Sequence, residues 1–201
     1  MAKLYFRYGA MNSGKSIEVL RTAHNYEEQG KCVLLLTPAV DHRDGVGTVS
    51  SRIGIRKDAV IVDDGLDLVA LAQEMKPDCV LVDEAQFLSA DHVEQLCAIA
   101  DDLDIPVIAY GLRADFQGKL FEGSYHLLAL ADKIEEIKAV CWRCSRKATM
   151  NMRLKEGVPV FEGEQIMIGG NESYLPVCRK CYRECRRQAE ASRAAAAEKQ
   201  V

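Results

Sequence analysis

The first segment that could carry out chemistry is a glycine-rich stretch near the amino terminus. It reads Gly9-Ala10-Met11-Asn12-Ser13-Gly14-Lys15-Ser16 and fits the P-loop pattern G-x-x-x-x-G-K-[ST] at every fixed position. The glycines let the backbone curl so that its N–H groups converge on phosphate oxygens, and the following helix points its positive end at the same anion. Lys15 can reach the outer phosphates, and the Ser16 hydroxyl can bind Mg²⁺. Because the segment lies between an expected strand and an expected helix, it indicates a nucleotide site rather than a chance turn.

A pair of carboxylates, Asp83-Glu84, directly follows the apolar run Cys79–Val82. At the end of a parallel strand such a carboxylate faces the P-loop, so Asp83 is placed to hold Mg²⁺ through water. Glu84 is then the candidate to accept a proton from the group that attacks the γ-phosphate. An alcohol and a water attack with the same geometry, and Asp-Glu-Ala-Gln also resembles the acidic motif of helicases. The pair therefore predicts phosphoryl transfer and leaves kinase and ATPase open.

Two cysteine pairs, Cys141-x-x-Cys144 and Cys178-x-x-Cys181, predict a structural zinc site with four thiolate ligands. Two-residue spacing lets both sulfurs of a pair reach one tetrahedral metal, and four thiolates leave no open position for catalysis. Two redox pairs, or thiols with no special role, are the alternatives. Cys185 follows one helical turn later and is expected to be a bystander, whereas Cys32, Cys79 and Cys97 lie in apolar patterns and are expected in the core.

A glycine-rich segment, Glu162–Tyr174, runs between the cysteine pairs. Its glycines allow close backbone approach to a ligand, and Met167, Ile168 and Tyr174 offer an apolar wall against which a base could lie. A surface hairpin that zinc ties down explains the same residues equally well. The residues alone leave the two interpretations open.

The bulk properties indicate a cytoplasmic globular protein. The chain has 201 residues and a formal net charge of −4, which suits one domain with a small addition and weighs against a nucleic-acid partner. No apolar run approaches the length of a membrane span, and Arg7 interrupts the start where a signal peptide needs continuous apolar residues. We therefore expect no membrane partner.

Alternating strands and helices predict an α/β fold with a parallel sheet and right-handed crossovers. Apolar runs of the kind that parallel strands show occupy residues 4–8, 32–36, 79–82 and 107–110, and helical spacing occupies residues 16–28, 66–75 and 92–103. Residues 41–56 hold three glycines with little periodicity and are expected to form a mobile loop.

Five motifs occur in the order of one family and together resemble the zinc-containing thymidine kinases shared by bacteria and animal cytosol. They are Gly9–Ser16, Asp83–Phe87, Tyr110–Phe116, the two cysteine pairs and Ile168–Tyr174, within a resemblance that covers residues 3 to about 185. Some bacterial relatives have His as the last zinc ligand, where this chain has Cys181.

The resemblance implies a P-loop NTPase (RecA-like) parallel sheet with a small zinc-binding lasso domain that closes over the nucleoside. The expected division is an ATP-binding domain at residues 1–139, the lasso domain at 140–187, and a helical or disordered tail at 188–201. It also implies a homotetramer that dTTP inhibits.

The activity that the resemblance implies is ATP-dependent phosphorylation of the 5′-hydroxyl of thymidine or deoxyuridine, giving dTMP in nucleotide salvage. Glu84 would be the general base, Asp83 and Ser16 would hold Mg²⁺, and Arg43 would lie near the phosphates. The resemblance assigns ATP binding to Gly9, Ala10, Met11, Asn12, Ser13, Gly14, Lys15, Ser16, Arg43, Asp83, Glu84, Ala85 and Gln86. It assigns nucleoside binding to Met11, Phe87, Leu112, Phe116, Phe121, Met167, Ile168, Gly169, Gly170 and Tyr174.

Three other functions fit part of the sequence. A nucleic-acid-dependent ATPase would need a second motor domain or a basic surface, and a nucleotide-sensing module would not need a carboxylate after Asp83. A kinase with another base preference differs too little for the residues alone to separate it.

Overall fold

The computed structural model of the chain describes residues 1–39, 47–165 and 174–198. The chain divides into two compact units. The first is made of Met1–Gly9, Gly14–Arg113 and Leu120–Ile137, and the second of Ala10–Ser13, Ala114–Lys119 and Lys138–Val201. The boundary that the sequence suggests between residues 139 and 140 stays a prediction.

The first unit is built on a six-stranded sheet in which every neighbouring pair is parallel, with the order β5-β2-β6-β7-β1-β8. The predicted parallel α/β sheet is thus confirmed. Its strands are β1 (Leu4–Gly9), β2 (Val33–Pro38), β5 (Val60–Val62), β6 (Cys79–Val82), β7 (Val107–Gly111) and β8 (Lys133–Ile137). The carboxyl ends of β6, β7 and β1 lie side by side at one edge, where ligands bind in open α/β sheets.

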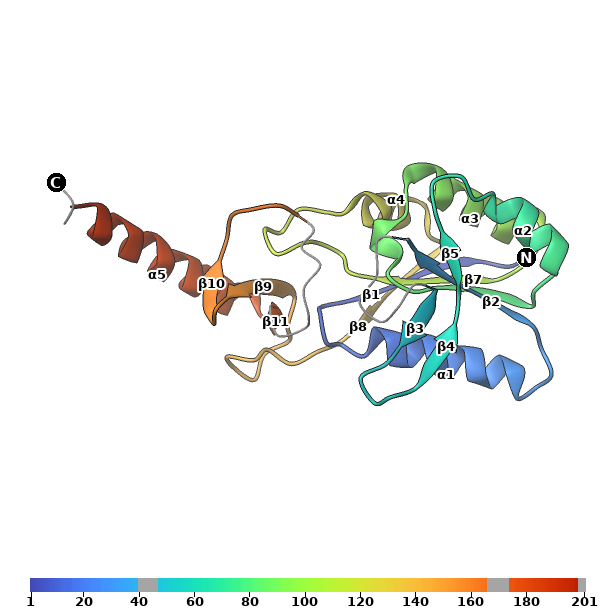
Figure 1. Cartoon of the computed structure of the whole chain (residues 1–201), viewed down its shortest axis with the longest axis horizontal. Helices are drawn as coiled ribbons and strands as arrows, with labels where there is room; N and C mark the ends of the chain where they lie inside the picture. Colours follow the sequence, from blue (N-terminus) through green and yellow to red (C-terminus); the bar gives the residue numbers. More distant parts are fainter. Residues whose placement is uncertain (40–46, 166–173, 199–201) are drawn as a thin grey trace. The chain divides into compact units, whose positions relative to one another are not determined.

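Helices cover both faces of this sheet (Figure 1). The helix α1 (Lys15–Glu27) packs Val19, Leu20 and Ala23 on one face, and α2 (Leu68–Met75), α3 (Ala90–Asp102) and α4 (Glu122–Leu130) pack on the other. Side chains cap two of them, since Asp67 accepts from Ala70 N–H at 2.8 Å and Ser89 accepts from His92 N–H at 3.2 Å. A single 3₁₀ turn, η1 (Ala85–Phe87), follows β6.

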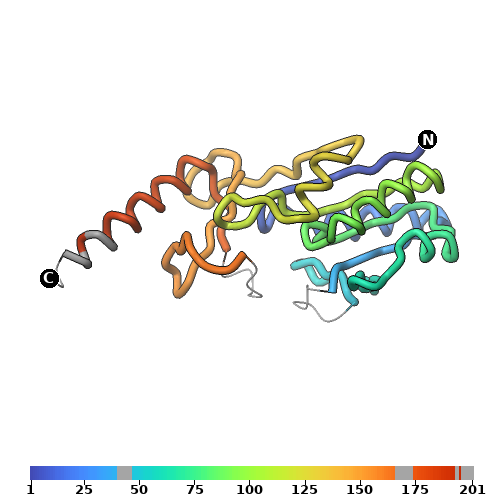
Figure 2. Tube along the Cα trace, turned by 90° about the horizontal axis from the view of Figure 1, so that it is seen from above, coloured from blue at the N-terminus to red at the C-terminus, as the bar shows by residue number. Residues whose placement is uncertain are grey.

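The second unit contains a three-stranded antiparallel sheet of order β10-β9-β11 and one long helix. The strands are β9 (Met150–Lys155), β10 (Val158–Val160) and β11 (Tyr174–Val177). The helix α5 (Arg179–Glu198) starts directly after β11 and extends away from this sheet (Figures 1 and 2). The predicted tail at residues 188–201 is therefore helical as far as the structure describes it.

Two sequence-based expectations are wrong. Residues 41–56 were expected to form a loop throughout, but β3 (Thr48–Ser50) pairs antiparallel with β4 (Arg56–Asp58) in a separate two-stranded sheet. Strands of three residues are too short to show a periodic pattern. Cys32 was expected in the core but is exposed just before β2, whereas Cys79 is fully buried. Among the helices that the structure describes, none has the length and apolar character needed to cross a bilayer.

Candidate active site

The P-loop residues Gly9–Ser16 connect β1 to α1. Asn12, with φ 62°, and Gly14, with φ 89°, adopt left-handed backbone conformations that turn the chain tightly before the helix. A Cβ added at Gly14 would meet no described atom within 4 Å, so there is space beside this turn. Ser13 Oγ is buried and finds no hydrogen-bond partner within the described residues. An open turn that is rich in donors at a helix amino terminus suits a phosphate group.

Asp83 lies at the carboxyl end of β6 and is 4% exposed. Burial, and after it the charge of Glu84, raises the pKa of Asp83 to about 7, while a hydrogen bond from the Ser16 hydroxyl and the charge of Lys15 oppose the rise. The structure thus brings together Asp83, Ser16 and Lys15, as the motifs suggest. A buried carboxylate beside a hydroxyl fits a hard cation such as Mg²⁺, which prefers oxygen ligands and stabilises the charged form.

Glu84 is held in an uncommon backbone conformation. Its φ of 51° and ψ of 36° are left-handed, and a non-glycine residue in such a conformation costs on the order of 1–3 kcal/mol. Gln86, which is 1% exposed, donates from Nε2 to the Glu84 carboxylate and accepts at Oε1 from the Leu112 N–H at 2.9 Å. One amide side chain therefore joins the carboxylate after β6 to the backbone after β7.

Two aromatic side chains meet at η1, the turn that follows Glu84, in the first unit. Phe87 and Phe121 meet edge to face, with ring centroids 5.6 Å apart and an angle of 80°. The close approach of α4 to η1 depends on Gly123, because a Cβ there would lie 2.4 Å from the Ala85 carbonyl oxygen. Ser124 Oγ also donates to the carbonyl of Leu112. Three residues that the resemblance assigns to the nucleoside, Phe87, Leu112 and Phe121, thus share one packed region.

The other assigned nucleoside residues within the described chain lie in the second unit. Met11 N–H donates to Asn151 Oδ1 at 2.8 Å, and Asn151 Nδ2 donates to the Ala114 carbonyl at 3.1 Å. Asn151 is 6% exposed. It therefore fixes the backbone of the P-loop at Met11 and the start of the segment Ala114–Lys119.

Arg153 organises the aromatic residues of the second unit. Its guanidinium carbon lies 3.9 Å from the centroid of Phe116 and 5.5 Å from that of Tyr174, and its Nε donates to the Tyr174 hydroxyl at 3.0 Å. The side chain is buried, and its Nη2 has no hydrogen-bond partner among the described residues. A buried guanidinium with an unused donor is positioned to bind an acceptor such as a carbonyl oxygen.

Hydrogen bonds also tie the segment Ala114–Lys119 to the chain after β10. Asp115 accepts at Oδ1 from the N–H groups of Gln117 and Lys119 at 2.8 Å, and at Oδ2 from Gln165 Nε2 at 3.1 Å. Gln117 Nε2 donates to the Gly163 carbonyl at 3.0 Å. The beginning of the glycine-rich segment is therefore fixed within the second unit.

The four cysteines of the two pairs converge. The sulfurs of Cys141, Cys144, Cys178 and Cys181 all lie within 4.8 Å of one another, and Cys144 lies 3.7 Å from both Cys178 and Cys181. Tetrahedral zinc with bonds of about 2.3 Å places its sulfurs roughly 3.8 Å apart, so the cluster fits this ion. The Cys181 N–H bonds to Cys178 Sγ at 3.4 Å and lowers the pKa of Cys178, which favours the thiolate form that binds metal. Cys185 is buried beside the cluster but is not part of it.

Five of the assigned residues lie outside the described residues: Arg43, Met167, Ile168, Gly169 and Gly170.

Asn151 and Arg153 could not be identified as site residues from the sequence. Both lie on β9, where they alternate with Met150, Met152 and Leu154. Such alternation predicts that the polar residues face solvent, but both polar side chains are buried. No local signal could have identified them, because their partners Met11, Phe116 and Tyr174 are distant in sequence.

Sequence comparisons with known proteins agree on one family. The family model described as thymidine kinase matches residues 2–182. A thymidine kinase of Streptococcus gordonii is 60% identical over 184 residues, covering 90% of this chain and 96% of that protein. A thymidine kinase of Lactococcus lactis is 59% identical, covering 90% of this chain and 97% of its own length. Among solved structures, the Pif1 helicase from Candida albicans matches with a TM-score of 0.39 and 14% identity, over 68% of this chain and 36% of the helicase. A likeness this weak carries no functional information.

Proposed function

The chain belongs to the thymidine kinase family, and on that premise we propose how its residues transfer a phosphoryl group from ATP to the 5′-hydroxyl of thymidine. The enzyme is a phosphotransferase that acts on thymidine. The observation that carries the proposed mechanism is the buried carboxylate of Asp83, next to the half-buried Glu84 and beside Ser16 and Lys15. Deoxyuridine, which lacks only the methyl group of the base, is proposed as a second substrate.

The P-loop holds the phosphates of ATP. Its backbone N–H groups and the amino terminus of α1 face the anion, and the Lys15 ammonium follows the charge of the transferred group. The Ser13 hydroxyl, buried without a partner among the described residues, is available to a phosphate oxygen. Arg43, Ala85 and Gln86 complete the proposed ATP site, with Gln86 acting through its hydrogen bond to Glu84.

Ser16 and Asp83 would hold Mg²⁺, directly or through water. When bound, the ion neutralises charge that develops on the phosphate oxygens. The pKa of Asp83, raised to about 7 by burial, means that its charged form needs a nearby cation. Lys15 and the ion would share that task.

Glu84 is the proposed general base. Gln86 orients its carboxylate, and the left-handed backbone at Glu84 fixes the direction in which the side chain leaves the chain. A base held in this way can accept the proton of the 5′-hydroxyl as that oxygen attacks the γ-phosphate. Orientation of this kind contributes to rate because it is established before the reaction starts.

Nucleoside binding is proposed for Phe87, Leu112 and Phe121 of the first unit and for Met11, Phe116, Met167, Ile168, Gly169, Gly170 and Tyr174 of the second. The described members are mostly apolar or aromatic, which suits the flat face of a base. Arg153 and Asn151 are positioning residues, since they hold Phe116, Tyr174 and Met11 in place.

Zinc is proposed to close the cluster of Cys141, Cys144, Cys178 and Cys181 and to stabilise the fold of the second unit. Thiolates of this kind persist in a reducing compartment, which supports a cytoplasmic location. A homotetramer and inhibition by dTTP follow from the family resemblance alone, and light scattering and inhibition assays with dTTP would test them.

The decisive test of the mechanism is Glu84→Gln, which keeps the shape of the side chain and removes the proton acceptor. Thymidine phosphorylation should fall by ~10²–10⁴-fold, while ATP binding persists. Glu74→Gln, an exposed change of the same chemistry on α2, is the control and should retain full activity. If Glu84→Gln turned over within a few-fold of wild type, the general-base assignment would be wrong. Measuring ATP hydrolysis without nucleoside in the same assays separates a kinase from an ATPase.

A further inference from the structure

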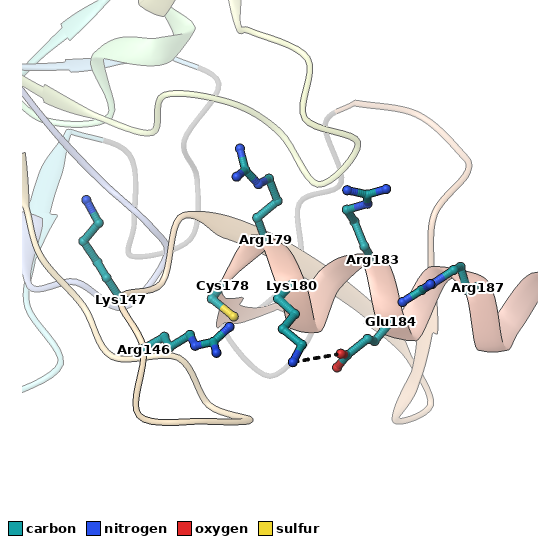
Figure 3. Close-up of a pocket in the computed structure, with 8 residues that line it drawn as sticks. All are labelled: Arg146, Lys147, Cys178, Arg179, Lys180, Arg183, Glu184 and Arg187. Atoms are coloured by element: carbon teal, nitrogen blue, oxygen red, sulfur yellow. Dashed lines mark ion pairs between the residues drawn. The ribbon is translucent and has the colours of Figure 1, made fainter.

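A strongly basic pocket lies beside the zinc cluster, in the second unit (Figure 3). It has a volume of about 550 Å³, and six of its eight lining residues are basic: Arg146, Lys147, Arg179, Lys180, Arg183 and Arg187. The other two are Cys178 and Glu184. None of the basic residues has a role in the proposed mechanism, so the pocket needs a separate explanation.

Two of the basic residues lie at the amino terminus of a helix, which is an unfavourable position for a cation. Arg179 and Lys180 open α5, and its first turn contains no acidic residue. The amino terminus of a helix carries partial positive charge, so a cation there is destabilising. A nearby anion would offset this unfavourable charge.

The negative charge of the cysteine cluster offsets only part of the positive charge in the pocket. A zinc ion with four thiolates would carry a formal charge of −2, whereas six basic residues and one acidic residue carry +5. Arg187 also lies six residues beyond Cys181, or about 9 Å along the helix axis, close to the screening length at physiological salt. Compensation of the thiolates therefore does not explain Arg187.

Three arginines of α5 form a regular row. Arg179, Arg183 and Arg187 are four residues apart, so they share one face of the helix at a rise of about 6 Å per step. Arg179 and Arg183 project to the same side of α5, and Lys180 and Glu184 form an ion pair of 3.7 Å on another side (Figure 3). The row thus presents several guanidinium groups, which bind phosphate oxygens in a bidentate manner.

We propose that this pocket binds a polyphosphate chain, as a second anion site separate in its residues from the P-loop. Linked phosphates match a row of guanidinium groups, and the volume lies within the usual range for small-molecule sites. The net charge of −4 for the whole chain opposes a long polyanion that extends beyond the pocket. The bound phosphates are either those of a nucleoside triphosphate or those of inorganic polyphosphate.

The test uses the zinc-loaded full chain with Lys15→Ala, which weakens the competing P-loop site. Inorganic tripolyphosphate is titrated by calorimetry, and the fluorescence of Trp142 is recorded in parallel. Trp142 is the single tryptophan of the sequence, is 66% exposed, and lies in the same cysteine knuckle as Arg146.

Arg183→Ala/Arg187→Ala should raise the dissociation constant of tripolyphosphate by about tenfold or more, because two charge-assisted contacts are lost. Arg187→Ala alone is also measured, and Arg186→Ala is its matched control. Arg186→Ala removes one positive charge from the same helix, but Arg186 does not line the pocket and pairs with Glu190 at 3.0 Å. It should change the constant less than about twofold. Zinc content is measured for each variant. Arg187→Ala alone, farther from the thiolates, replaces the double variant if that variant loses zinc.

Each outcome bears on the proposal. The proposal is supported if the pocket variants selectively weaken the binding of tripolyphosphate. If they weaken the binding of ATP in parallel, the ligand is a nucleoside triphosphate. If they weaken only the binding of tripolyphosphate, the ligand is inorganic polyphosphate. Equal constants for wild-type and pocket variants would overturn it, as would equal weakening by Arg186→Ala. Affinity for oligothymidylate that keeps rising with length beyond the pocket would also overturn it, in favour of a nucleic-acid surface.

Discussion

Replacing Gly123 by alanine should damage catalysis without any change to a residue proposed to touch substrate. The added Cβ would lie 2.4 Å from the Ala85 carbonyl oxygen, 2.9 Å from that of Leu88 and 3.0 Å from that of Gln86. All three oxygens belong to the backbone around η1, so none can rotate away as a flexible side chain could. Bringing the closest contact to 3.0 Å requires a movement of at least about 0.6 Å between α4 and η1.

This movement sets the size of the effect. Overpacking of this kind costs about 1–3 kcal/mol, and a chain of this length loses roughly 2–4 °C in Tm per kcal/mol, so Tm should fall by about 2–12 °C. Glu84 directly precedes η1, and Gln86 within it orients the Glu84 carboxylate. A misplacement near 1 Å can lower a rate by about 10²-fold, so kcat should fall by ~10-fold to ~10²-fold.

The assay compares Gly123→Ala with Gly65→Ala in thymidine phosphorylation and in thermal unfolding. Gly65 is the matched control, because a Cβ there would meet its nearest atom, Asp63 Oδ1, at an ordinary 3.6 Å. We expect Gly65→Ala to behave as wild type. If both variants had the same kcat and the same Tm, the packing of α4 on η1 would not position Glu84.

Three further predictions concern the fixed P-loop, the metal cluster and the buried carboxylate. Asn151→Leu leaves the Met11 N–H without its acceptor and should raise the KM for ATP by ~10-fold. Asn151→Asp keeps an acceptor, so its KM for ATP should lie between those of Asn151→Leu and wild type. Equal KM values for all three proteins would contradict this prediction. Cys144→Ser should abolish stoichiometric zinc in elemental analysis and make residues 140–187 sensitive to protease, and a zinc-free variant that stays active and resistant would refute it. The pKa of Asp83 rises from 3.8 to about 7 on folding, so the folded, Mg²⁺-free protein binds the extra proton between these values and its free energy of unfolding should decrease as pH rises through them. Asp83→Asn should flatten that decrease in chemical unfolding of the zinc-loaded protein without added Mg²⁺, and an unchanged slope would show that Asp83 is not the group responsible.

The sequence predicts the sheet well where strands are continuously apolar. β6 spans Cys79–Val82 as expected, because a parallel strand buried on both faces leaves a clear pattern. The edge strand β8 was missed, since its sequence Lys-Ile-Glu-Glu-Ile looks like solvated chain and its first residues are exposed. Charged residues on an edge strand hinder pairing with other chains, and the same charges hide the strand from a hydrophobic pattern.

Residues within the motifs can be predicted from the sequence, whereas the residues that support them cannot. Lys15, Asp83 and the four cysteines have fixed local spacing that chemistry requires, so the sequence alone identifies them. Arg153 gains its surroundings only when β9 pairs with β11, which places it directly across from Tyr174. Contacts made by long-range pairing leave no trace in local spacing, and a single sequence cannot predict them.

The hydrogen bond between Met11 and Asn151 also constrains the order in which the protein assembles. It joins residues 140 positions apart, so the backbone around Met11 gains this contact only after most of the chain has been made. Closing so long a loop is entropically unfavourable until other contacts have formed, and contacts of high sequence separation slow folding. During synthesis on the ribosome, the helix α1 can form early, whereas the P-loop backbone at Met11 gains its contact only after β9 has been made. We therefore expect a nascent chain to gain ATP affinity late, once the strand that carries Asn151 has emerged.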